Sequence, residues 1–151
     1  MSDFVKASLV FLNNPATNVD EALAFIANKA TELGIADDEQ ALLAAFKARE
    51  DQGTTGMMAG FAIPHCKSAA VKEAAVMVVK FAGDVEWDSM DGKPIRNAIA
   101  LLVPEGEVGT TFLRMLSQVA VMLMDEEFRA KIVSTDDPVE IVAIINGGIK
   151  L

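Results

Sequence analysis

Two apolar runs in the second half of the chain are the most regular feature of its hydrophobic pattern. Residues 75–81 and 99–103 are almost continuously apolar and have the length of strands. Such runs are typical of interior strands that are covered on both faces. Shorter apolar stretches at 8–12 and 61–63 predict two further strands, and the alternation over residues 85–87 indicates a short one. The pattern therefore predicts a mainly buried sheet.

Helical spacing of apolar residues follows the first predicted strand and returns after the last one. Asn18 and Glu21 form an N-terminal capping pattern before a helix that Gly34 can end, and a second helix is expected over 37–49. The later helices are expected as follows: an apolar stripe over 112–123, a helix capped by Asp125 that reaches about Val133, and a last one opened by Asp137 and Pro138. This order of strands and helices predicts an α/β fold, with a mixed sheet between helical layers.

Length and composition agree with one folded unit. The chain has 151 residues, of which 52% are hydrophobic and 23% charged, so we expect a single domain over residues 1–151. No apolar run is long enough to span a membrane, and the N-terminus lacks the pattern of a signal peptide, so we expect a cytoplasmic protein without direct membrane insertion. The net charge of −9 argues against nucleic acid as a partner.

The chain contains one cysteine, Cys66, and one histidine, His65. This excludes an intramolecular disulfide, a cage of paired cysteines for zinc and a site built on two histidines of this chain. Residues 47–72 carry a net charge of +2, so the single histidine lies in a cationic segment of an acidic protein.

His65 is the first candidate for chemistry. It follows Pro64, which stiffens the backbone that leads to the imidazole. A neutral imidazole nitrogen is nucleophilic, and phosphorylation of that nitrogen is natural chemistry for it. The alternative is an ordinary histidine at the end of a strand. Cys66 is expected to point to the opposite face and to act as a small buried apolar residue.

Two neighbouring features can hold an anion. Arg49 is expected at the end of a helix, where its guanidinium can bind phosphoryl oxygens or simply face solvent. The segment 53–60 contains three glycines, and its backbone N–H groups and threonine hydroxyls can approach an anion, although it lacks the ending of a Walker loop. The acidic residues of segment 84–91 are expected to form a solvated turn rather than a metal loop, and no metal or other cofactor is expected.

These pieces occur together in a known family. The segment Arg49 to Gly56, followed by Gly60-Phe61-Ala62-Ile63-Pro64-His65, resembles the enzyme IIA domains of the mannitol/fructose class of the bacterial phosphoenolpyruvate-dependent sugar phosphotransferase system. The likeness continues through Val85-x-Trp87, Asp91-Gly92-Lys93-Pro94-Ile95, Leu101-Leu102-Val103-Pro104-Glu105 and Leu113-x-x-Leu116-Ser117, so it covers nearly the whole chain.

The resemblance implies a three-layer α/β/α sandwich with a mixed sheet of four to five strands. It implies that His65 accepts phosphate on Nε2 from the phosphocarrier protein HPr and passes it to a IIB domain for sugar uptake. Arg49 is then the cation beside the phosphate, and Thr55 a second phosphate-binding residue. The protein would be a phosphotransferase component with a phosphohistidine intermediate.

The chain departs from the family pattern at two positions. Phe112 stands where the family usually has a second active-site histidine, and Cys66 stands where it usually has glycine. Phe112 cannot donate a hydrogen bond to phosphate. Two alternatives to the carrier role therefore stay open: a regulatory module whose phosphorylation state controls a protein partner, and a structural domain that has lost transfer.

Overall fold

The computed structural model describes residues 7–106 and 109–148, and for residues 109–112 the backbone alone. Its described strands form one mixed sheet whose centre is an antiparallel pair, β4 (Ala75–Val85) and β5 (Ile95–Pro104). Strand β1 (Val10–Asn14) runs parallel to β4, while β2 (Phe61–Ala62) and β3 (His65–Ser68) both run parallel to the other side of β5. The two apolar runs are thus the interior strands, as their pattern predicted.

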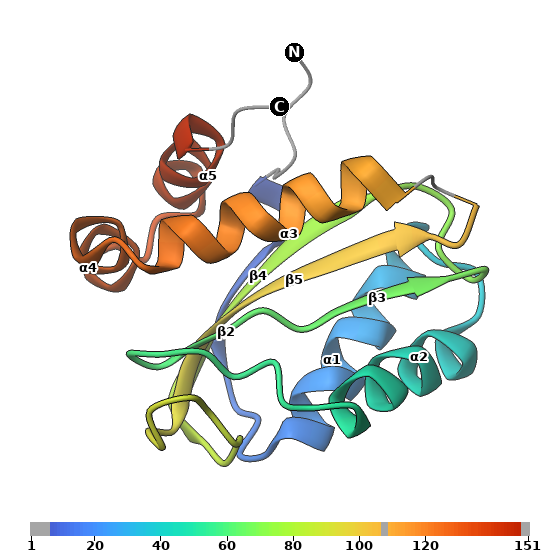
Figure 1. The fold of residues 1–151 in the computed structure, drawn as a ribbon, viewed down its shortest axis with the longest axis horizontal. Coiled ribbons are helices and arrows are strands. Elements are labelled where there is room, and N and C mark those ends of the chain that lie inside the picture. The colour runs from blue at the N-terminus through green and yellow to red at the C-terminus, as the bar shows by residue number, and fades with distance from the viewer. Residues whose placement is uncertain (1–6, 107–108, 149–151) are drawn as a thin grey trace.

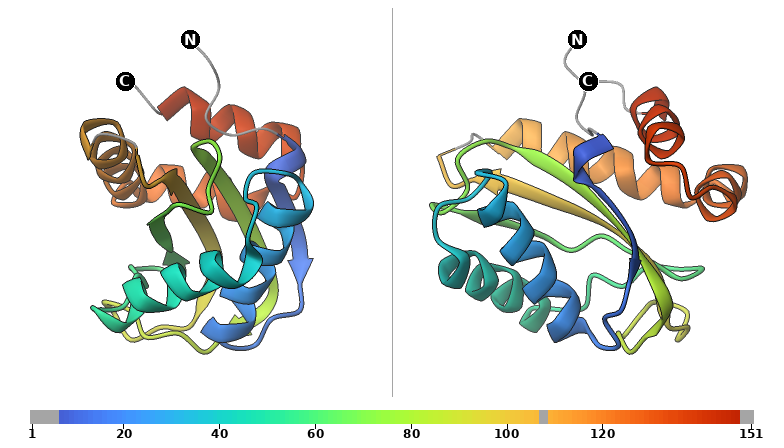
Figure 2. Two further views of the ribbon diagram at one scale, coloured as in Figure 1. Left: turned by 90° about the vertical axis from the view of Figure 1, so that its right-hand side faces the viewer. Right: turned by 180° about the vertical axis from the view of Figure 1, so that it is seen from behind.

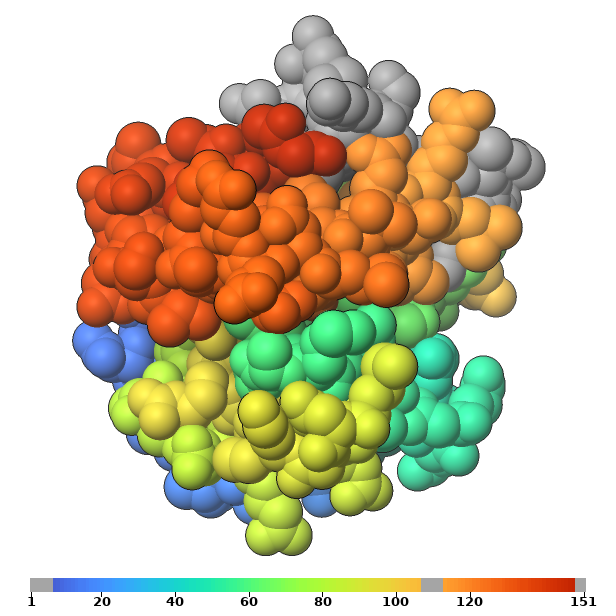
Figure 3. All heavy atoms as spheres, turned by 60° about the vertical axis from the view of Figure 1, so that its left-hand side comes forward, coloured from blue at the N-terminus to red at the C-terminus, as the bar shows by residue number. Residues whose placement is uncertain are grey.

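Helices cover both faces of this sheet (Figure 1, Figure 2). Helices α1 (Val19–Glu32) and α2 (Glu39–Asp51) cover one face, and α3 (Gly109–Leu123), α4 (Glu126–Ser134) and α5 (Pro138–Gly148) cover the other. Each layer encloses its own hydrophobic cluster against the sheet. The space-filling view separates the layer of α3–α5 from the rest of the molecule (Figure 3). The expected three-layer α/β/α sandwich is confirmed.

The helix starts agree with the capping residues expected from the sequence. The side chains of Asn18 and Asp125 each accept a backbone N–H of the first turn of α1 and α4, and Asp38, which was not expected as a cap, does the same for α2. These bonds satisfy N–H groups that a helix leaves unpaired at its start. After α1 the chain turns at Gly34, whose φ of +79° favours glycine.

The sequence interpretation was wrong at three places in the sheet. Strand β1 begins two residues later than expected, because residues 7–9 form a short 3-10 helix, η1. Residues 85–87 are not a separate strand: Val85 ends β4, and Glu86 pairs its backbone only with Thr17 and Val19. Strand β3 is not predicted by the sequence, since Pro64 is expected to end the strand before it.

Pro64 interrupts the pairing without turning the chain away. Proline has no N–H to donate, so β2 ends before it. Its carbonyl accepts the N–H of Leu101 at 2.9 Å, which keeps the chain beside β5. Pairing resumes at once, and His65 becomes the first residue of β3, opposite Leu101.

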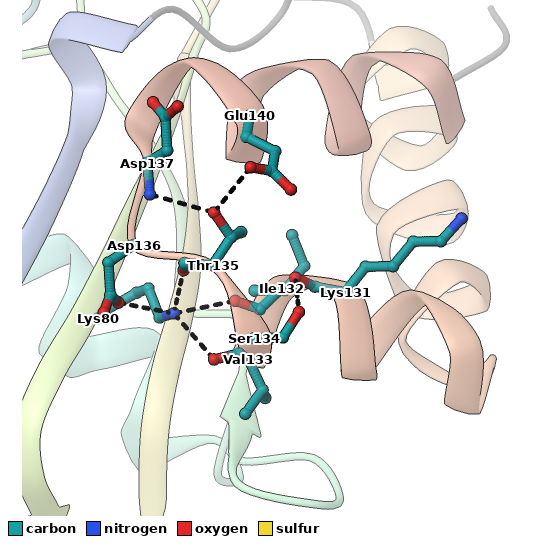
Figure 4. Close-up of polar contacts among 9 residues, drawn as sticks. All are labelled: Lys80, Lys131, Ile132, Val133, Ser134, Thr135, Asp136, Asp137 and Glu140. Carbon is teal, nitrogen blue, oxygen red and sulfur yellow. Dashed lines mark hydrogen bonds and ion pairs between the residues drawn. The ribbon is translucent and has the colours of Figure 1, made fainter.

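A buried lysine ties the sheet to the helical layer of α3–α5 (Figure 4). Lys80, on β4, is 9% exposed, and its ammonium donates to the carbonyls of Ile132 at 2.9 Å and Thr135 at 2.6 Å. It also reaches Asp136 at 3.2 Å. The charge thereby satisfies carbonyls that the C-terminus of α4 leaves unpaired and complements the negative end of its dipole. No helix within residues 7–106 and 109–148 is long and apolar enough to cross a membrane.

We predict that Lys80→Met lowers the free energy of unfolding by about 2–3 kcal/mol, because charged hydrogen bonds to carbonyls that stay buried are lost. Denaturant unfolding followed by circular dichroism measures the change. Lys131→Met is the matched control, since its side chain is 58% exposed and its ammonium forms an ion pair with the exposed Glu127. Equal stabilities of the two variants would show that Lys80 does not hold α4 in place.

Candidate functional site

The imidazole of His65 has both nitrogens fixed by protein groups. The residue is 9% exposed at the start of β3. Its Nδ1 lies 2.7 Å from the carbonyl oxygen of Ile63. A carbonyl only accepts hydrogen bonds, so Nδ1 carries the hydrogen and Nε2 of the neutral ring keeps its lone pair. The backbone just before Pro64 therefore selects the tautomer in which Nε2 is the nucleophilic atom.

Arg49 reaches that same nitrogen from the last turn of α2. It lies three residues after Phe46 and seven after Leu42, the two buried residues of this helix, so the helical repeat turns it toward the sheet. Its Nε–H donates to Nε2 of His65 at 3.0 Å, and its Nη1 donates to the carbonyl of Gly53 at 2.7 Å. The remaining N–H groups of the guanidinium are the donors with which arginine binds phosphoryl oxygens.

The surroundings favour a neutral imidazole. Burial lowers the pKa of His65 below its ordinary value of 6.5, and the positive charge of Arg49 adds to the decrease. The hydrogen bond to Ile63 and the negative charge of Glu50 act in the opposite direction but are smaller in sum. The geometry also favours the neutral imidazole, because a protonated Nε2 would point its hydrogen at the N–H of Arg49.

The glycine-rich segment, residues 53–60, lies beside this pair, but the hydrogen-bond donors of its Thr55 are directed to Glu50. The backbone N–H and the hydroxyl of Thr55 both donate to the carboxylate of Glu50. The side chain of Glu50 also accepts the indole N–H of Trp87 at 3.2 Å. The structure thus brings His65 and Arg49 into contact and places Thr55 on Glu50. Direct contact between Thr55 and a phosphate stays a prediction.

The sequence singles out neither Glu50 nor Trp87 as a site residue, although both lie in segments that carry the family resemblance. By its sequence pattern alone, Glu50 is an ordinary helix-end carboxylate and Trp87 a packing residue. One signal was available: Glu50 follows Phe46 by four residues and Leu42 by eight, so it shares the buried side of α2 with Arg49.

Cys66 is buried in the cluster beneath α1 and α2, and burial raises the pKa of its thiol to about 12. Leu101, which lies opposite His65, belongs to the cluster on the other face. Phe112 lies within α3, but its side chain is outside the described residues. In the described part of the chain, no group of three or more acidic, cysteine or histidine side chains is arranged to hold a metal ion.

The chain resembles known proteins along most of its length. Residues 3–148 match the family model described as phosphoenolpyruvate-dependent sugar phosphotransferase system, EIIA 2. The 2-O-alpha-mannosyl-D-glycerate-specific EIIABC component of Escherichia coli is 33% identical over 136 residues, which make up 89% of this chain and 21% of that protein. The fructose-specific EIIA component of Haloferax volcanii is 32% identical over 136 residues, 90% of this chain and 88% of that protein. The chain therefore spans about a fifth of the first relative and most of the second.

Solved structures agree with the fold. The nitrogen regulatory protein IIA-Ntr of Neisseria meningitidis is 25% identical, with a TM-score of 0.86 over 94% of this chain and 96% of that one. Enzyme IIA of the mannitol system in the E. coli complex with phosphorylated enzyme IIB is 18% identical and superposes with a TM-score of 0.78, over 95% of this chain and 97% of that one. The latter likeness concerns the fold alone.

We predict that the pKa of His65 lies below 6.5 in the folded protein, and that Arg49→Met raises it, because a nearby positive charge is removed. NMR titration of the imidazole resonances measures both values without ambiguity, since the chain has one histidine. Because the pKa is lower folded than unfolded, this residue should reduce stability as the pH falls through and below about 6.5. A pKa at or above 6.5 in the wild type would contradict this description of the site.

Proposed function

Since the chain belongs to the EIIA 2 family of the phosphoenolpyruvate-dependent sugar phosphotransferase system, we propose that it carries a phosphoryl group on Nε2 of His65. The observation that supports this most strongly is the pair of contacts on the imidazole. The carbonyl of Ile63 keeps the hydrogen on Nδ1, and Arg49 places a cation at Nε2. A nucleophile and a charge-stabilising group thus meet at one atom.

The transfer step uses the lone pair of Nε2. It attacks the phosphorus of a phosphorylated donor in line, so the Nε2–P bond forms as the bond from phosphorus to the donor nitrogen breaks. The electron pair of the broken bond leaves with the donor. Positive charge grows on the ring of His65, and the Ile63 carbonyl, which accepts from Nδ1–H, stabilises it.

Arg49 first covers Nε2 of His65 and then stabilises the negative charge of the phosphoryl oxygens. Its Nε–H now occupies the lone pair of Nε2, so the guanidinium has to shift when phosphorus approaches. After a small shift its N–H groups meet the phosphoryl oxygens, which carry the negative charge of the transition state. Gly53 holds the far side of the guanidinium and limits this movement.

The partners follow from the family. We propose HPr as the donor and a IIB domain as the acceptor, with sugar uptake as the outcome and the cytoplasm as the location. The likeness to relatives named EIIABC components, which are 33% identical to this chain, supports the second partner.

A regulatory role is the second candidate. The high structural similarity to the nitrogen regulatory protein IIA-Ntr favours it, as do relatives with that name, among them one from Bradyrhizobium diazoefficiens that is 31% identical over 87% of this chain. Phe112 in place of a histidine also fits a protein whose phosphorylation state matters more than its rate of turnover. In this case the phosphorylated or unphosphorylated form would bind a protein partner.

Incubation with phosphoenolpyruvate, enzyme I and HPr, followed by intact mass, tests both roles. We expect the wild type to gain one acid-labile phosphate and His65→Ala to gain none. Arg49→Ala should slow the gain by about 10²-fold or more, because a preorganised cation is lost at the developing charge. Lys47→Ala is the control, since this side chain is exposed on the same helix.

Addition of a purified IIB domain of the mannitol or fructose class then separates the two roles. Rapid loss of phosphate from His65 to IIB supports the carrier. A stable phosphoprotein that does not react with IIB domains favours the regulatory module. Wild-type protein that gains no phosphate, or Arg49→Ala that gains it at the wild-type rate, would overturn the assignment of the site.

A further inference from the structure

The carboxylate of Glu50 is a meeting point for donors from two distant parts of the chain. Its Oε1 accepts the backbone N–H of Thr55 at 3.1 Å and the indole N–H of Trp87 at 3.2 Å, and the hydroxyl of Thr54 lies 3.4 Å away. Its Oε2 accepts the hydroxyl of Thr55. All these donors are neutral, and no lysine or arginine of the described residues forms an ion pair with it. Hydrogen bonds alone therefore fix this half-buried charge.

Trp87 stands on the segment after β4, 37 residues beyond Glu50. The residues that follow it are tightly joined to the glycine-rich segment. The hydroxyl of Thr54 donates to the carbonyl of Asp88 at 2.6 Å, and a Cβ on Gly56 would lie 2.0 Å from that same oxygen. In Figure 3 the two segments, green and yellow, lie side by side on the surface. Glycine at position 56 is thus required by the close approach of the two backbones.

A second contact with the segment after β4 fixes the other end of the glycine-rich segment. The side chain of Asp91 accepts the N–H of Ala59 at 2.9 Å, and this bond is the main cause of a lowered pKa for that carboxyl. Ala59 has a φ of +58°, which is uncommon for a residue with a side chain, so its conformation needs such support. The acidic segment that the sequence presents as a solvated turn therefore braces the glycine-rich segment along its length.

The braced segment in turn sets the position of Arg49. Its first residue, Gly53, accepts the N–H of Arg49 Nη1 at 2.7 Å, and the other side of the guanidinium donates to His65. Movement of Gly53 would carry the guanidinium away from Nε2. Hydrogen bonds thus link the indole of Trp87 to Glu50 and Glu50 to Thr55, the backbone joins Thr55 to Gly53, and two further hydrogen bonds link Gly53 through Arg49 to the nucleophile.

We propose that Glu50 and Trp87 are positioning residues for phosphoryl transfer, which hold the glycine-rich segment so that Arg49 stays beside Nε2 of His65, where a small shift brings its N–H groups to the phosphoryl oxygens. This inference rests on the proposed function. Neither residue needs to touch the phosphoryl group. Thr55 belongs to the same device, because both its donors are directed to Glu50.

Two conservative substitutions test the inference. Trp87→Phe keeps an aromatic ring but removes the N–H, and Glu50→Gln keeps a carbonyl acceptor but removes the charge. From the strength of one neutral hydrogen bond, Trp87→Phe should lower kcat for phosphorylation by phospho-HPr about threefold to tenfold. Glu50→Gln, which weakens several charge-assisted bonds, should lower kcat about tenfold to a hundredfold. KM for phospho-HPr should stay within about twofold of the wild-type value, because the docking of the donor is unchanged.

Met90→Ala is the matched control, since Met90 lies in the same segment but is 69% exposed and its side chain makes no hydrogen bond. A second readout does not depend on turnover. The ¹⁵N resonance of Nε2 in the unphosphorylated protein reports the hydrogen bond from Arg49, and it should shift in both variants but not in Met90→Ala. Thermal unfolding verifies that each variant is folded at the assay temperature.

The outcomes separate this inference from the proposed function. If the wild type accepts phosphate and both variants keep the wild-type kcat and the wild-type Nε2 resonance, the positioning role is wrong. A rise in KM with unchanged kcat would also overturn it, because it would place the two residues in donor docking. If the wild type accepts no phosphate, the proposed function fails, while the Nε2 resonance still tests the hydrogen-bonded chain.

Discussion

The two hydrogen bonds on the imidazole of His65 are the constraint on which the rest of the site depends. In one, Nδ1–H donates to the carbonyl of Ile63, which fixes the tautomer; in the other, Arg49 donates to Nε2 and places a cation at that nitrogen. Both need a rigid frame, because a shift of one ångström would break either bond. The frame is the edge of a sheet buried between two helical layers. Its strand β5 holds the chain on both sides of Pro64, so that the histidine enters the site with little freedom.

Much of this frame could be predicted from the sequence, and the exceptions have physical causes. Interior strands are apolar on both faces, and helix starts have capping residues, so β4, β5 and the starts of α1 and α4 agree with the pattern. Strand β3 could not be seen, because four residues that begin with histidine have no periodicity of their own, and their pairing is supplied by β5. The same holds for the start of β5 at Ile95, where register with β4 extends the strand beyond its apolar run.

In the site, too, the residues close in sequence could be predicted, whereas contacts between distant segments could not. His65 and Arg49 lie in one short stretch of chain, so their motif and the helical repeat could reveal them together. Glu50 and Trp87 are joined only by the fold, and a tryptophan that donates a hydrogen bond has the same sequence pattern as one that only packs. The resemblance places Thr55 at the phosphate, and in the structure its hydroxyl donates to Glu50. The glycine-rich loop, which looks like an anion cradle in the sequence, also accepts a hydrogen bond from Arg49 through the carbonyl of Gly53.

Nε2 of His65 is the atom proposed to carry the phosphate, and NMR of the phosphorylated protein with ¹⁵N-labelled histidine is the most direct test. We expect a one-bond ³¹P–¹⁵N coupling at Nε2, while Nδ1 keeps its hydrogen and its bond to Ile63. Coupling at Nδ1, or a phosphate on any residue other than His65, would contradict the assignment of the nucleophile and the tautomer on which it rests.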